Sequence, residues 1–160
     1  MSFSTRTATA LCLAFSLAVI GYVLFSQYVQ NYQPCELCLR ERLPWYTAIG
    51  LGIVGLIRPS PWILAAIGLV FLVATGLGLH HVGVEQKWWE GPQGCTGNMA
   101  GANSVEELRK MIQSAQYVRC DEITWTLFGL SMATYDFLVS LAAAVATLFA
   151  ARRLIGAAHA

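Results

Sequence analysis

Residues 8–29 read ATALCLAFSLAVIGYVLFSQYV, an apolar stretch of 22 residues without a charged side chain. As an α-helix this stretch is about 33 Å long, and the hydrocarbon core of a bilayer is about 30 Å thick. The run is longer than the apolar core of a secretory signal, and no small-x-small cleavage site precedes the polar residues 27–33. We therefore expect a membrane-spanning helix here and not a leader peptide.

Three further apolar segments follow, and the composition agrees with a membrane protein. Apolar residues make up 56% of the 160 residues and charged residues 12%, which is about half the charged share of a soluble domain. The expected spans are residues 43–57, 62–79 and 127–151, and the first of these can begin as early as Cys35. The chain is therefore expected to be a single integral membrane domain over residues 1–160, an all-α, antiparallel bundle of four transmembrane helices. A net charge of +1 without a basic run indicates no nucleic-acid partner.

The charges around the expected spans predict their orientation. Four arginines lie in short polar pieces that contain no acidic residue: Arg6, Arg58, Arg152 and Arg153. The opposite side mixes six Lys and Arg residues with eight acidic residues over a much longer stretch. Positive-inside reasoning puts both termini in the cytoplasm, so that the long connection from His80 to Thr126 is periplasmic.

The long connection contains one helix signal. Ser104-Val-Glu-Glu107 has the spacing of a capping box and predicts a short helix through about Gln113. Its apolar residues recur at helical spacing, so the helix can lie on the membrane surface or pack within the loop. The sequence does not distinguish these two arrangements.

Two cysteine pairs fall on the same expected side of the membrane. Cys35 and Cys38 follow the first span as a Cys-x-x-Cys motif, and Cys95 and Cys120 lie in the long connection. A proline directly before Cys35 is well placed to open a helix whose free N–H groups stabilise a thiolate. The pattern predicts a dithiol relay in an oxidising compartment. Cys95/Cys120 could instead be a structural staple worth roughly 3–4 kcal/mol, and Cys12, inside the first span, is expected to be a buried apolar residue without a redox role.

Arg42 and the histidines at the third span are the other candidate residues. Arg42 stands four residues after Cys38, so a continuous helix puts both on one face, where a guanidinium can stabilise a thiolate or a reduced anionic ligand. Pro44 opposes this geometry because it disfavours helix at the preceding residue. Cys38, one turn before Arg42, is nevertheless expected to be better placed than Cys35 for an electron acceptor at the lipid boundary. His80 and His81 end the third span and could hydrogen-bond a membrane cofactor, although solvated boundary histidines are more common.

Several cofactors are disfavoured by the motifs. Leu39 follows the Cys-x-x-Cys where c-type haem attachment needs histidine, and a zinc ribbon needs a second Cys-x-x-Cys. No Gly-x-Gly-x-x-Gly fingerprint of a flavin-binding Rossmann unit is present. We therefore expect no metal, haem or flavin. Oxidation of a dithiol at the lipid boundary releases two electrons, for which a lipid-soluble quinone, ubiquinone or menaquinone, is the natural acceptor.

Nearly the whole chain resembles a known family, the bacterial disulfide bond formation protein B (DsbB) quinone reductases. The resemblance lies in the four spans, Cys95 and four motifs: Pro34-Cys-Glu-Leu-Cys-Leu-Arg-Glu-Arg42, His81-Val-Gly, Val118-Arg-Cys-Asp-Glu and Trp125-x-Leu-Phe-Gly-Leu-Ser-Met132. It implies a multi-pass protein of the bacterial inner membrane that reoxidises a periplasmic, thioredoxin-like thiol oxidase (DsbA-like).

The resemblance also implies roles for single residues. Cys95/Cys120 would take electrons from the partner, with Cys95 forming the mixed disulfide, and Cys35/Cys38 would reoxidise that pair. Cys38 would pass the electrons to quinone, and Arg42 would help to bind it.

One departure and two alternatives remain. Asp136 stands near the start of the fourth span, where relatives often carry an uncharged residue, and if buried it needs a partner. The alternative functions are a disulfide-stapled structural membrane protein and a membrane reductant conductor with the opposite direction of electron flow.

Overall fold

The computed structural model describes residues 4–92, 104–106, 109, 118–123 and 125–158. Four long helices and one short hairpin are the main elements of this part of the chain. In chain order they are α1 (Thr5–Tyr28), α2 (Glu36–Ile57), α3 (Pro61–Glu85), β1 (Thr126–Leu127), β2 (Leu130–Ser131) and α5 (Met132–Ala158).

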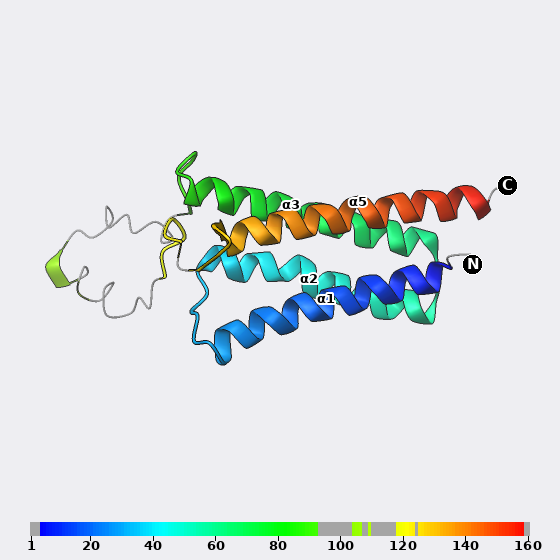
Figure 1. Ribbon diagram of the computed structural model, residues 1–160, viewed down its shortest axis with the longest axis horizontal. Helices are drawn as coiled ribbons and strands as arrows, with labels where there is room; N and C mark the ends of the chain where they lie inside the picture. Colours follow the sequence, from blue (N-terminus) through cyan, green and yellow to red (C-terminus); the bar gives the residue numbers. More distant parts are fainter. Residues whose placement is uncertain (1–3, 93–103, 107–108, 110–117, 124, 159–160) are drawn as a thin grey trace.

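The four long helices lie side by side along the long axis of the molecule (Figure 1). Successive helices run in opposite directions, so both ends of the chain lie near the same end. α3 packs most extensively, against α5 and α2, and α1 packs mainly on α2. This arrangement brings the start of α2, the end of α3 and the start of α5 together at the other end.

Three of the described helices, α1, α3 and α5, are long and apolar enough to cross a membrane. α2 is not among them, and its first two turns contain Glu36, Arg40, Glu41 and Arg42. The prediction of four membrane spans is therefore confirmed, by length and composition, for three helices.

The helix boundaries differ from the predicted ones in two places. α3 continues to Glu85 instead of ending near Leu79, so His80 and His81 lie within its last turns. α2 begins at Glu36 and continues through Pro44, although proline disfavours helix at the residue before it. Because α2 is continuous from Cys38 to Arg42, these two residues lie one turn apart at the N-terminal end of the same helix.

The fourth long helix begins at Met132 and not near Leu127. β1 and β2 pair antiparallel just before it, and the turn between them has positive φ at Phe128 (51°) and Gly129 (80°). Positive φ at both central residues is typical of the tight hairpin turn whose twist matches that of paired strands. Tyr135 Oη donates a hydrogen bond to the Leu127 carbonyl, which ties the hairpin to α5.

The interior combines large apolar side chains with close helix contacts. Trp45, Ile67 and Phe71 belong to one buried hydrophobic cluster. At the crossing of α3 and α5, a Cβ placed on Gly78 would lie 2.9 Å from the backbone nitrogen of Phe137. Glycine therefore permits the close approach of these two helices, as expected for small residues in membrane helices.

Cys95 lies outside the described residues. So does most of the short helix expected between Ser104 and about Gln113, of which residues 105, 106 and 109 are described as helical. The expectation for this helix stays a prediction.

Candidate dithiol site

Cys35 is the N-cap residue of α2. Its backbone is extended (φ −75°, ψ 172°), and its Sγ accepts a hydrogen bond from the Cys38 backbone N–H at 3.2 Å. The first N–H groups of a helix have no partner within the helix, and sulfur bound to one of them gains from the positive end of the helix dipole. The sequence prediction of a helix opening at this motif is confirmed.

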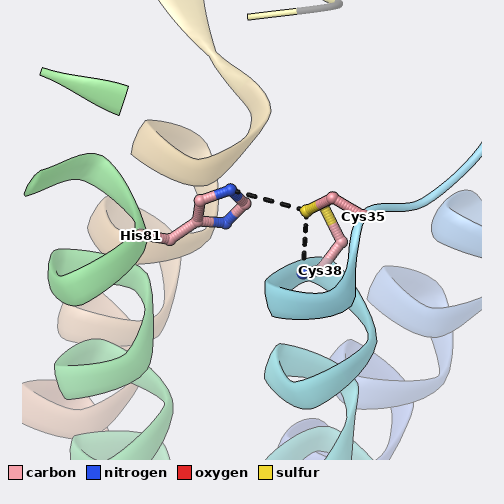
Figure 2. A group of neighbouring side chains, drawn as sticks. All are labelled: Cys35, Cys38 and His81. Atoms are coloured by element: carbon pink, nitrogen blue, oxygen red, sulfur yellow. Dashed lines mark hydrogen bonds between the residues drawn. The ribbon is translucent and has the colours of Figure 1, made fainter. Parts of the chain in front are cut away.

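The two sulfurs of the motif face each other. Cys35 and Cys38 are both free thiols, and their Sγ atoms share a hydrogen bond at 2.8 Å (Figure 2). Cys35 is buried, with 4% of its surface exposed, whereas Cys38 is half-buried. A pair so close can form a disulfide with little movement of the backbone.

His81 reaches the pair from α3 (Figure 2). Its Nε2 lies 3.6 Å from Cys35 Sγ, and its Nδ1 lies 2.9 Å from Glu41 Oε1. When Glu41 and Cys35 are both ionised, both accept hydrogen bonds, and the ring then donates from each nitrogen and carries a positive charge. Glu41, His81 and Cys35 thus form a buried, hydrogen-bonded chain between α2 and α3.

These contacts favour a thiolate on Cys35. The hydrogen bond between the two sulfurs lowers the pKa of Cys35 most, burial opposes this effect, and the ring of His81 lowers the pKa further, so that the resulting pKa is about 4. The negative charge of the reduced pair is thus favoured on Cys35, whereas Cys38 is the more exposed of the two sulfurs. The reason is the position of His81, which contacts Cys35 and so draws the negative charge to that sulfur.

Arg42 does not hydrogen-bond the cysteines. Its Nη1 donates a hydrogen bond to Gln27 Oε1 at 2.7 Å, which links α2 to the end of α1. Its Nε is buried and has no hydrogen-bond partner within the described part of the chain. Buried donors are normally paired, so this N–H is available to a ligand.

A cavity of about 90 Å³ connects these side chains. Its lining includes Cys35, Cys38, Arg42, His81 and Asp136. A more open, apolar groove of about 400 Å³ runs between α1 and α5, and its size lies within the range of small-molecule sites, about 300–1,000 Å³. Cavity and groove share five lining residues: Val19, Val23, Trp125, Met132 and Asp136.

Cys120 lies next to the inner pair. It is disulfide-bonded and buried, with 1% of its surface exposed, and it belongs to the same apolar cluster as Cys35. The neighbouring Arg119 forms an ion pair with Asp121, and the hydrogen bond that Arg119 donates lowers the pKa of Asp121. The guanidinium charge beside Cys120 is therefore already paired.

Three ligand atoms in the site could hold a metal ion. The sulfurs of Cys35 and Cys38 and one ring nitrogen of His81 lie within 4.8 Å of one another, among the described residues. Such a set suits a thiophilic ion such as zinc, with Glu41 orienting the histidine. The sequence motifs do not indicate this set, because His81 follows Cys38 by more than forty residues.

Two side chains of the site had no assigned role in the sequence analysis. Glu41 stands three residues after Cys38, so the helical spacing places it on the same face, and this signal could have found it. Asp136 was noted as a departure, but the sequence does not reveal its neighbours. In the structure both line the cavity.

The helices and the site define an integral membrane protein with a dithiol centre. The model of the family "Disulfide bond formation protein DsbB" matches residues 5–150. The chain therefore belongs to the DsbB family, whose members form disulfide bonds through membrane-bound oxidoreductase chemistry.

Individual relatives agree with this assignment. The chain is 30% identical over 126 residues to disulfide bond formation protein B 2 of Pseudomonas aeruginosa, and the aligned segment covers 75% of each of the two chains. It is 29% identical over 147 residues to disulfide bond formation protein B of Haemophilus influenzae, covering 81% of this chain and 77% of the relative. The protein of the same name from a Polaromonas strain is 27% identical over 156 residues, covering 93% and 92%.

Proposed function

We propose that the protein is a thiol:quinone oxidoreductase of the bacterial inner membrane. It reoxidises a periplasmic, thioredoxin-like thiol oxidase (DsbA-like) and passes the electrons through Cys95/Cys120 and Cys35/Cys38 to ubiquinone or menaquinone. In this arrangement α2 completes a four-helix membrane bundle, the termini are cytoplasmic, and both cysteine pairs face the periplasm.

One observation carries the proposal: the buried cluster that holds Cys120 also holds Cys35. A relay requires one sulfur of each pair to be able to meet, and these two belong to the same packed group. A structural disulfide has no need of a second, free dithiol beside it, and that dithiol contains a stabilised thiolate. Proximity and a low thiol pKa together favour exchange over a purely structural role.

The electrons, protons and disulfide bonds of the proposed relay balance over three stages. The partner's dithiol becomes a disulfide as Cys95 and Cys120 gain its two electrons and two protons. Cys120 then forms a bond to Cys35, whose bond to Cys38 breaks, and Cys95 displaces Cys35 to restore the outer disulfide. Finally Cys35 and Cys38 form their disulfide, and their two electrons and two protons reduce quinone to quinol.

The surroundings of the cysteines fit a quinone as the electron acceptor. The cavity provides Cys38 together with unpaired hydrogen-bonding atoms for ring oxygens, and the adjoining groove provides apolar surface for a tail. When bound, quinone supplies two-electron oxidation. Cys38 is half-buried, more accessible than Cys35, and is therefore the sulfur that we place next to it.

Thiol trapping tests this function. We expect the purified, reduced protein to lose the four thiols of its two cysteine pairs when a decyl-benzoquinone is added anaerobically, with one quinol formed for every two thiols lost. Without quinone the thiols should persist. Two bridges that form without quinone, or resist mild reductant, would indicate a stapled structural protein instead, and thiols reachable from the cytoplasmic face would indicate a reductant conductor.

Replacing Arg42 tests its place beside the quinone. Arg42→Gln removes the unpaired guanidinium N–H, so we expect the KM for decyl-benzoquinone to rise about tenfold, the typical effect of losing one hydrogen bond from a charged donor. Disulfide exchange with the partner in a quinone-free single turnover should stay within about twofold.

Arg40→Gln is the matched control for Arg42. Arg40 lies half a turn away on α2, is exposed, and pairs with Glu36 outside the cavity. This variant should leave the KM for quinone unchanged. If Arg42→Gln slows the quinone-free exchange as much as it impairs the use of quinone, Arg42 has only a structural role.

A further inference from the structure

Asp136 lies half-buried in the second turn of α5 and is held by α2. Its Oδ1 accepts a hydrogen bond from the indole Nε1 of Trp45 at 2.9 Å. Trp45 is 2% exposed and belongs to the buried hydrophobic cluster with Ile67 and Phe71, so it fixes the carboxyl group in one orientation. The second oxygen of Asp136 is therefore not free to swing toward water.

That second oxygen has no partner. Oδ2 is buried and makes no hydrogen bond to any described residue. A Cβ placed on Gly78 of α3 would come within 3.2 Å of it, so a larger residue there would crowd this oxygen. A buried polar atom left unpaired costs roughly 1–3 kcal/mol, and such atoms in proteins call for a functional explanation.

The position of Asp136 supplies that explanation. Among the described residues, Asp136 is the one acidic residue that lines both the cavity of the cysteines and the apolar groove between α1 and α5. Arg42 and Ser26 also line the cavity, and each has a buried polar atom without a hydrogen-bond partner among the described residues, Nε of Arg42 and Oγ of Ser26. Among the described residues the cavity thus offers three unsatisfied polar groups, from α1, α2 and α5, and of these three residues Asp136 also lines the apolar groove.

We propose that Asp136 is a binding contact for one ring oxygen of the quinone and of the quinol formed from it. A quinone ring has two oxygens on opposite edges, so Arg42 and Asp136 together would set its orientation, with the tail directed along the groove. A carboxyl group suits both redox states, because as an acid it donates to a carbonyl and as a carboxylate it accepts from a hydroxyl. The inference rests on the proposed reduction of quinone and adds a specificity-determining residue to it.

Two substitutions of Asp136 separate the binding role from a structural one. With dithiothreitol as the dithiol donor and decyl-benzoquinone as the acceptor, Asp136→Leu should raise the KM for quinone about tenfold, as expected for the loss of one buried hydrogen bond. The KM for dithiothreitol should not change. Asp136→Asn keeps an oxygen for Trp45 and puts an N–H₂ group in the place of Oδ2, so its KM for quinone should stay within about threefold of the original.

Inhibition by the product gives a readout that a structural role would not affect. The amide of Asp136→Asn cannot accept a hydrogen bond from a quinol hydroxyl at this position, so the inhibition constant for decyl-benzoquinol should rise about tenfold while the KM for quinone does not. Ser140→Ala is the matched control. Ser140 lies one turn further along α5, is fully buried and lines neither the cavity nor the groove, and its loss should change neither constant.

Three outcomes would overturn the proposal, and a fourth identifies a different failure. Asp136→Leu with an unchanged KM for quinone, a parallel rise of both KM values, or equal quinone and quinol effects in Asp136→Asn would each show that Asp136 does not contact the ring. If the unmodified protein reduces no quinone at all, the proposed function itself is wrong, and this inference is wrong with it.

Discussion

Replacing Cys38 by serine should abolish quinone reduction, with a loss of more than about 1,000-fold in turnover, because the variant can no longer close the inner disulfide. Cys35 keeps its helix-cap position in this variant and can still exchange with the outer pair. The mixed disulfide with the partner should therefore still form through Cys95. Quinol production, followed by its ultraviolet spectrum, and trapping of the mixed disulfide on a non-reducing gel measure the two halves of the reaction separately.

Cys12→Ala is the control for this loss. Cys12 lies in α1, where its sulfur is 3.4 Å from Thr147 Oγ1, and it lines neither the cavity nor the groove. This variant should keep nearly full turnover. Quinone reduction that survives in Cys38→Ser, or a mixed disulfide that forms on Cys35 in the otherwise native protein, would contradict the proposed order of the relay.

Replacing His81 by glutamine should move the titration of Cys35 to higher pH. With a pKa of about 4, Cys35 is a thiolate at every pH above that value and loses its charge only as the pH falls through 4. Glutamine cannot carry the positive charge that helps to hold this pKa down, so the protonated thiol should persist to higher pH. The thiolate absorbance of the reduced protein near 240 nm measures this shift, and we expect at least a tenfold smaller thiolate fraction at pH 5.

The neighbouring histidine offers a matched control. His80 lies next to His81 on α3, but its ring stacks on Trp89, 6.0 Å away between centroids, and not on the cysteines. His80→Gln should leave the titration of Cys35 unchanged. Coincident titration curves for His81→Gln and the unmodified protein would show that the hydrogen bond to Cys38 alone accounts for the low pKa.

The apolar segments, and the polar and proline-containing stretches that separate them, were sufficient to predict the four long helices, but not all of their ends. Residues 80–85 mix histidine, glycine and glutamate with valine, so their composition does not mark them as membrane helix, yet α3 continues through them because they pack against the start of α2. Leu127, Phe128 and Leu130 are apolar and were assigned to the last helix. The glycine at position 129, with its positive φ, permits the hairpin that they form instead.

The parts of the site that depend on residues close together in the sequence were predictable. The helix cap at Cys35 follows from the proline and the Cys-x-x-Cys motif, and Glu41 could have been added from helical periodicity. The contact of His81 with Cys35 joins residues 46 positions apart, so it depends on the packing of α3 on α2. The sequence alone therefore did not indicate that His81 favours a thiolate on Cys35.

Helix-capping by Cys35 has a consequence for the reduction potential of the inner pair. The helix N-terminus and His81 stabilise a charge that exists only in the reduced state, since a disulfide sulfur carries none. Whatever stabilises the reduced form makes the disulfide a stronger oxidant, by about 30 mV for each factor of ten. The first turn of α2 therefore biases the Cys35/Cys38 disulfide toward taking electrons, so that the fold itself helps to set the direction in which electrons leave the outer pair.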